Sequence, residues 1–150
     1  VLRWFLSSKI PLFGKNGRVI GIAGAMHDFE KAGAVLRPYH EMQEVIAHIL
    51  THYGESLSLS ELADMQGLSV SQLVRNFRRV LHATPNQFLL RVRVHAACQL
   101  LVSTDASIAK IALDTGFYDQ SYFSKQFRRR MGISPHAYRQ RYRHAAEVDF

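Results

Sequence analysis

Two groups of polar side chains in the second half of the chain are spaced so that each group lies on one side of a helix. Both groups combine hydroxyl, amide and cationic side chains, which can hydrogen-bond to base edges in the major groove of DNA. Arg75 can hold guanine O6 and N7 through two bonds, and Gln72 or Gln120 can hold adenine in the same way. The predicted base-reading residues are Ser71, Gln72, Arg75, Gln120, Ser121, Ser124 and Lys125.

Further cations lie later in the same two helices, where side chains meet phosphate oxygens rather than base edges. Such contacts position a protein on a duplex without specifying its sequence. The predicted phosphate-binding residues are Arg78, Arg79, Arg128 and Arg129. Val74 is a candidate contact to a thymine methyl group, and Tyr122 is a candidate contact to the groove wall. The basic surface is expected to continue into Arg139, Arg141 and Arg143.

The charge distribution supports a polyanionic partner for this half of the chain. The 150 residues have a formal net charge of +7. Residues 1–68 carry six Lys or Arg against seven Asp or Glu, whereas residues 69–150 carry thirteen against five, so the halves have net charges of −1 and +8. A strongly basic segment beside a near-neutral one favours binding of nucleic acid by the basic segment.

Two helix pairs, at about residues 58–82 and 107–131, must position these side chains. In the first pair, Ser58-Leu59-Ser60-Glu61 has the pattern of a capping box, and Ser69 can cap the second helix after a turn at Gly67. In the second pair, Ser107 precedes the first helix and Thr115-Gly116-Phe117 forms the turn, with Phe117 expected to pack inside it. Each pair has the pattern of a helix-turn-helix.

Two longer helices are expected around these pairs. The first runs from about Pro38 to Tyr53 and ends at Gly54. The second is capped by Thr84 and continues to about Ser103, with apolar residues on several sides, so both helix pairs can pack against it. Cys98 lies in this apolar run and is expected in the core rather than as a nucleophile.

The two helix pairs are related by an internal repeat. Leu62-Ala63 and Gly67 match Ile111-Ala112 and Gly116 at an offset of 49 residues, and the second helices match at an offset of 50. At that offset the outward positions agree in chemistry: Ser71 matches Ser121, Arg75 matches Lys125, and Arg78-Arg79 matches Arg128-Arg129. Two patterns in register are much stronger evidence for a helix-turn-helix than either alone.

The repeat resembles the DNA-binding domain of the AraC/XylS family of bacterial transcription regulators over about residues 38–143. Its most specific part is Ile108-Ala109-Lys110-Ile111-Ala112, Gly116-Phe117, Ser121-Tyr122-Phe123-Ser124, Phe127-Arg128, Gly132-Ile133-Ser134-Pro135 and Tyr138-Arg139. The resemblance implies a mainly α DNA-binding domain at residues 38–144. In this domain a long central helix joins two helix-turn-helix subdomains. It also implies sequence-specific regulation of transcription, with promoter DNA and RNA polymerase as partners, in the cytoplasm.

The N-terminal residues differ in pattern from the rest. Residues 1–30 read as two strands around an Asn16-Gly17 turn, and residues 31–37 read as a linker. The series Trp4, Lys9-Ile10-Pro11-Leu12, Gly17, Ile20-Gly21 and Asp28 resembles the closing hairpin of a PAS sensor domain. The expected domain order is therefore the end of a PAS-like domain, a linker and the DNA-binding domain. Because the chain begins with Val1, we expect a longer protein whose N-terminal region receives a ligand or other signal.

Other classes of function have less support in the sequence. No phosphate-binding glycine loop, carboxylate pair or cysteine–histidine spacing indicates an enzyme, and no cofactor is expected. His40, Glu44, His48 and His52 recur at i+4 and could hold zinc or nickel, but a solvated polar face explains them more simply. No apolar run is long enough to span a membrane. The alternative to a regulator is an architectural helical module that binds nucleic acid without sequence preference.

Overall fold

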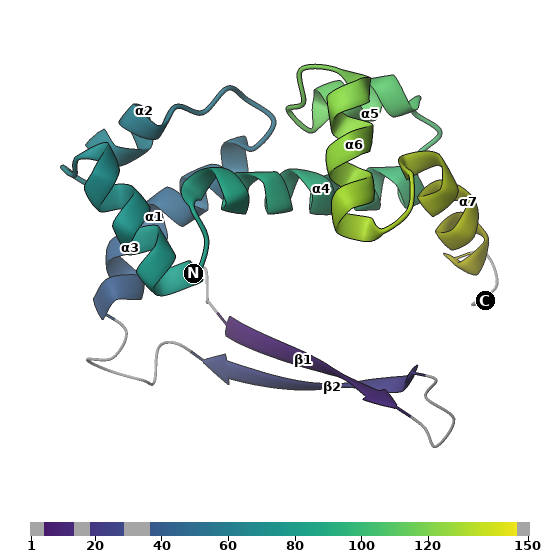
Figure 1. Cartoon of the computed structure of the whole chain (residues 1–150), viewed down its shortest axis with the longest axis horizontal. Helices are drawn as coiled ribbons and strands as arrows, with labels where there is room; N and C mark the ends of the chain where they lie inside the picture. Colours follow the sequence, from purple (N-terminus) through teal and green to yellow (C-terminus); the bar gives the residue numbers. More distant parts are fainter. Residues whose placement is uncertain (1–4, 14–18, 29–36, 147–150) are drawn as a thin grey trace. The chain divides into compact units, whose positions relative to one another are not determined.

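The computed structural model describes the backbone of residues 5–13, 19–28 and 37–146 and the side chains of residues 42–143. It divides the chain into two compact units, Val1–Glu41 and Met42–Phe150. The first unit contains a β-hairpin and the second is helical (Figure 1).

The hairpin consists of β1 (Phe5–Phe13) and β2 (Val19–Asp28), which pair antiparallel. The pairing register shifts between Leu12 and Phe13. The two predicted strands are confirmed, whereas the Asn16-Gly17 turn lies outside the described residues. Most of the predicted linker also lies outside them, and Arg37, its last residue, is instead the first residue of a helix.

Seven helices follow among the described residues, in the order that the sequence predicts. They are α1 (Arg37–His52), α2 (Leu59–Asp64), α3 (Val70–Leu81), α4 (Pro85–Ser103), α5 (Ile108–Asp114), α6 (Gln120–Met131) and α7 (Pro135–Ala146). Helices α2 and α3 form the first helix-turn-helix, and α5 and α6 form the second. The two motifs lie towards opposite ends of α4 (Figure 1).

Local side-chain hydrogen bonds fix where these helices begin. Reciprocal capping boxes open α2, α3 and α4, so the first backbone amides of each helix find acceptors. Their residue pairs are Ser58 with Glu61, Ser69 with Gln72 and Thr84 with Gln87. Ser107 caps α5 as predicted. The cap of α6 is Asp119, a residue with no predicted role, whose carboxylate accepts the Tyr122 amide at 2.7 Å.

The central helix α4 contributes to the core on more than one side. Val94, Ala97 and Leu101 of α4 pack with Phe123 and Phe127 of α6 in the second lobe, which comprises α5, α6 and α7. Helix α4 also contacts α3 of the first lobe, which comprises α1, α2 and α3. The predicted role of α4 as a shared scaffold is confirmed.

Two further sequence predictions about the core are confirmed. Phe117 is buried in the turn between α5 and α6, with its ring centroid 5.0 Å from that of Phe123. Cys98 is buried in α4, and its burial raises the pKa of the thiol, which disfavours the reactive thiolate.

Helices α3 and α6 end differently at equivalent positions of the repeat. Helix α6 is followed by Gly132 at φ +78°, whereas α3 is followed by His82 at φ +49°, the one described non-glycine residue with positive φ. Glycine adopts this left-handed conformation at no steric cost, but a side chain at the same backbone angles is strained.

His82→Gly should therefore stabilise the chain by about 0.5–1 kcal/mol, because relief of the strain exceeds the entropy that glycine adds to the unfolded chain. Gly132→Ala is the matched reverse substitution. A Cβ at Gly132 would have no neighbour within 4 Å, so the loss of about 1 kcal/mol would come from the backbone alone. Urea unfolding of both variants measures the two effects, and destabilisation by His82→Gly contradicts the strain argument.

Candidate nucleic-acid interface

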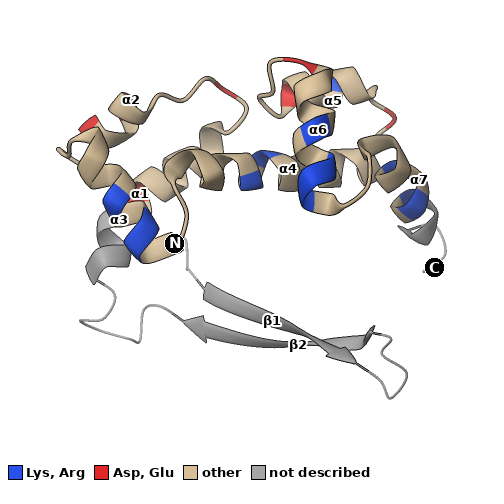
Figure 2. Ribbon diagram, viewed as in Figure 1, with Lys and Arg blue, Asp and Glu red and all other residues tan. Residues whose placement is uncertain are grey.

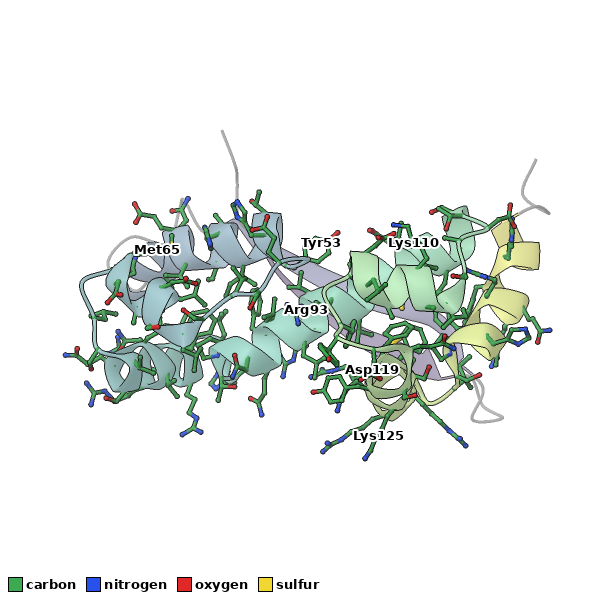
Figure 3. The ribbon with its side chains drawn as sticks, turned by 90° about the horizontal axis from the view of Figure 1, so that it is seen from above. Tyr53, Met65, Arg93, Lys110, Asp119 and Lys125 are labelled. Carbon is green, nitrogen blue, oxygen red and sulfur yellow. The ribbon has the colours of Figure 1, made fainter. Side chains whose placement is uncertain are left out.

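The second helix of each motif presents the predicted base-reading side chains to solvent. Ser124 is half-buried and the other six are exposed. On α6, Lys125 points away from the body of the lobe, on the opposite side from Lys110 of α5 (Figure 3). The fold therefore brings each predicted group onto one accessible surface of a helix that follows a tight turn.

Charge is separated between the two helices of each motif. Helices α3 and α6 together carry seven Lys or Arg and no Asp or Glu. Helices α2 and α5 carry the acidic residues Glu61, Asp64 and Asp114, and Lys110 of α5 is paired with Asp114. Figure 2 shows this separation along the ribbon. A polyanion would therefore be attracted to the second helix of each motif.

Four of these cations are the predicted phosphate-binding arginines, and all four are exposed in the last turns of their helices. Arg130 adds a fifth cation at the end of α6. Its pKa is lowered by partial burial and by the charges of Arg91 and Arg129. Arg91 lies on α4, so this cationic cluster joins two helices, and a bound anion would relieve the repulsion within it.

Gln72 has a second task that the base-reading prediction did not include. Its side-chain carbonyl oxygen accepts the Ser69 backbone amide at 2.9 Å as part of the capping box of α3. A two-bond contact to adenine needs that oxygen as well as the amide nitrogen. While the box is closed, one of the two lone pairs of that oxygen is occupied and the amide group is oriented by Ser69, so Gln72 has less freedom to reach adenine than the sequence suggests.

Two tyrosines stand at the start of α6. Tyr118, in the turn, is 92% exposed, and Tyr122, in the first helical turn, is 50% exposed. Of the two, only Tyr122 is a predicted contact. Since exposed aromatic side chains beside a recognition helix can contact the sugar–phosphate backbone, Tyr118 joins the candidate interface. Its position before the Asp119 cap is the sequence signal that could have identified it.

The arginines of α7 do not all extend the basic surface, contrary to our expectation. Arg139 donates from Nε to the Leu101 carbonyl at 3.2 Å and from its terminal nitrogen to the Ala106 carbonyl at 2.6 Å. Arg143 pairs with Asp105 at 2.6 Å. Both side chains hold the segment after α4, where backbone carbonyls at a helix C-terminus attract cations. Arg141 is exposed.

The histidine stripe of α1 has a local explanation in the described side chains. The rings of His48 and His52 stack with centroids 4.3 Å apart, and His52 Nδ1 lies 3.1 Å from the His48 carbonyl oxygen. The side chain of His40 lies outside the described ones. Within the described part of the chain, no three potential metal ligands converge, and no helix is both long and apolar enough to cross a membrane.

Two helix-turn-helix motifs on a shared helix define a class of DNA-binding domain. Residues 62–141 match the helix-turn-helix domain family. The chain belongs to this family, and its domain is of the AraC type.

Among similar solved structures is the DNA-binding domain of AdpA, a global transcriptional factor, in complex with a target DNA. It is 33% identical to this chain, covers 72% of it and 97% of its own chain, and has a TM-score of 0.68. An AraC-type regulator from Chromobacterium violaceum is 31% identical over 68% of this chain and 91% of its own, with a TM-score of 0.65.

Curated relatives include the MmsAB operon regulatory protein of Pseudomonas aeruginosa, which is 37% identical over 73% of this chain and 37% of its own length. The regulator GbdR of the same species is 37% identical over 67% of this chain and 27% of its own length. The chain thus spans about a quarter to two fifths of the length of these relatives.

The Asp105–Arg143 pair gives a test of how α7 is held. Arg143 donates a hydrogen bond to the Asp105 carboxylate and lowers the pKa of that group below its ordinary value of 3.8. Arg143→Gln should return the Asp105 pKa toward that value, as an NMR pH titration would show. Because the folded pKa is lowered, the stabilisation is present above the unfolded pKa and is lost as pH falls. Arg141→Gln should leave the titration unchanged.

Proposed function

We propose that this chain is the DNA-binding part of a transcription regulator that inserts α3 and α6 into the major groove of promoter DNA. The observation that carries the proposal is the pair of exposed, acid-free recognition helices in register at the two ends of one scaffold helix. The AdpA domain, which has the same fold, is in complex with a target DNA. This similarity supports sequence-specific binding rather than non-specific binding through charge alone.

Base reading falls to the first turns of each recognition helix. In α3 the readers are Ser71, Gln72 and Arg75. Arg75 has the reach and the two-pronged geometry to select guanine. In α6 the readers are the exposed residues Gln120, Ser121 and Lys125 and the half-buried Ser124.

Phosphate binding falls to Arg78, Arg79, Arg128 and Arg129. They lie in the last turns of α3 and α6, where a guanidinium can reach the backbone on either side of the groove. These contacts supply affinity that depends on salt, because each neutralised phosphate releases counterions.

The N-terminal hairpin belongs, in this proposal, to a PAS-like sensor domain that passes a ligand or partner signal to the DNA-binding domain. The two paired strands and the series from Trp4 to Asp28 support it. RNA polymerase is the partner that a promoter-bound regulator would address, and the cytoplasm is where bacterial promoters lie. The chain covers only 37% and 27% of the length of the two curated relatives, which is compatible with such a domain in the full protein.

Selection of bound sequences from a random duplex pool tests the proposal directly. We expect an enriched sequence with two conserved segments about one helical turn, roughly 34 Å, apart, because each lobe carries one recognition helix. An architectural module would enrich no sequence and would bind bulk DNA as well as the selected duplex.

Two single substitutions should distinguish base recognition from phosphate binding. Arg75→Ala should cost about 1–3 kcal/mol on the selected site and relax preference at one base position, because a two-bond contact is lost. Arg128→Ala should weaken binding to all duplexes similarly and lower the salt slope by about one. Salt-titrated affinities for selected and random duplexes measure both.

Lys110→Ala is the matched control, since Lys110 lies on the opposite side of the lobe and is already paired with Asp114. It should leave affinity and salt slope unchanged. Equal behaviour of Arg75→Ala and Arg128→Ala on the two duplexes would contradict the division of roles.

A further inference from the structure

The two lobes touch through more than the helix they share. Arg93 of α4 donates from Nε to the Tyr53 carbonyl at 2.7 Å and from a terminal nitrogen to the Glu55 carbonyl at 2.8 Å. Both carbonyls follow the end of α1 at His52, where the helix dipole is negative. The guanidinium therefore holds the loop between α1 and α2 against the central helix, between the two lobes (Figure 3).

The turn of the second motif closes on the same point. A Cβ added to Gly116 would lie 2.6 Å from the Tyr53 carbonyl oxygen and 2.8 Å from Arg93 Nε. A Cβ added to Gly54 would lie 3.1 Å from the Asp114 carbonyl oxygen. The backbone of the α1–α2 loop and the backbone at the end of α5 and in the turn after it thus approach closely: a side chain at Gly116 is excluded, and one at Gly54 would require its neighbour to shift slightly. We call this contact the lobe junction: Tyr53, Gly54, Arg93, Asp114 and Gly116.

The corresponding glycine of the first motif shows that this closeness is not a requirement of the turn itself. Gly67 has φ +61° and Gly116 has φ +82°, so both need a left-handed backbone. A Cβ at Gly67 would nevertheless have no neighbour within 4 Å. Both glycines shape a turn, but Gly116 alone of the two also lets the lobes meet.

The junction is connected to the recognition helix of the second lobe. Burial lowers the pKa of Arg93, and Tyr122, in the first turn of α6, is close enough to raise it by charge interaction. Tyr122 also packs near Phe117 of the turn, with ring centroids 6.2 Å apart. A shift of Arg93 or of the turn would therefore move the start of α6.

We infer that the lobe junction fixes the angle between the lobes and so sets the spacing of the two DNA segments that α3 and α6 read, with Arg93 as the positioning residue. This inference rests on the proposed function. One base pair inserted between the segments moves the second by about 3.4 Å and rotates it by about 34–36°. A lobe locked by hydrogen bonds and backbone contact cannot follow that movement without breaking them.

The test uses the 150-residue chain and the duplex selected from the random pool, together with duplexes that have one base pair added or removed between the two segments. The wild-type chain should bind the altered duplexes about 10–100-fold more weakly, as when one or more base contacts are lost. Arg93→Ala should reduce this ratio to about threefold or less, because a loosely tethered second lobe reaches both spacings. Affinity for the original duplex should fall as well.

Conservative and matched variants keep the result interpretable. Arg93→Lys keeps the charge, but its compact ammonium lacks the fork that spans two carbonyls, so its ratio should lie between those of the wild type and Arg93→Ala. Gly116→Ala should also weaken the spacing preference. Gly67→Ala strains an equivalent turn without touching the junction, so it should retain the wild-type ratio. Circular dichroism identifies any variant that does not fold. The spacing preferences of the folded variants then test the inference.

Salt titration separates a positioning role from direct DNA contact. Arg93→Ala should keep the wild-type salt slope, whereas loss of a phosphate contact would lower the slope by about one and overturn the inference. A wild-type spacing preference in folded Arg93→Ala or Arg93→Lys would overturn it too. If the wild-type chain selects a sequence but tolerates every spacing, the inference fails alone. If the chain selects no sequence, the proposed function fails.

Discussion

The fold depends on the burial of one helix from two directions. Helix α4 lies in the core of the second lobe through Val94, Ala97 and Leu101 and also contacts α3 of the first lobe. Apolar residues lie on several sides of α4, whereas Gln87, Arg91, His95 and Gln99 are exposed along one side, so the two lobes cover the remaining surface of the helix. Helix α4 therefore positions both α3 and α6, and the lobe junction further fixes the position of one lobe relative to the other.

Two groups of arginines can be distinguished by their partners among the described side chains. Those on α3 and on the outer side of α6 are exposed, whereas Arg93 donates to backbone carbonyls just beyond the end of α1, and Arg139 donates to one carbonyl in the last turn of α4 and one just beyond it. The guanidinium group serves both, because its planar set of donors suits two carbonyls as well as a phosphate. Composition alone therefore overstates how much of the positive charge is available to DNA.

Local patterns predicted the helices well because their signals lie within a few residues. Ser58 with Glu61, and Thr84 with Gln87, place caps that the structure confirms. The lobe junction had no such signal, since Arg93 and Tyr53 are forty residues apart and a guanidinium–carbonyl contact has no sequence periodicity. The prediction for Gln72 was incomplete for a related reason. The residue fits both a capping-box pattern and a base-reading pattern, and only the geometry shows that its oxygen already accepts the Ser69 amide.

The repeat also relates the last described helix to the central one. Helix α7 occupies, fifty residues on, the place of α4: Ser134 and Pro135 stand where Thr84 and Pro85 stand, and Arg143 stands where Arg93 stands. A further motif could in principle be added to α7 as the second is added to α4, as in a solenoid. Helix α7 is polar where α4 is apolar, so it offers no comparable apolar surface on which a further motif could pack.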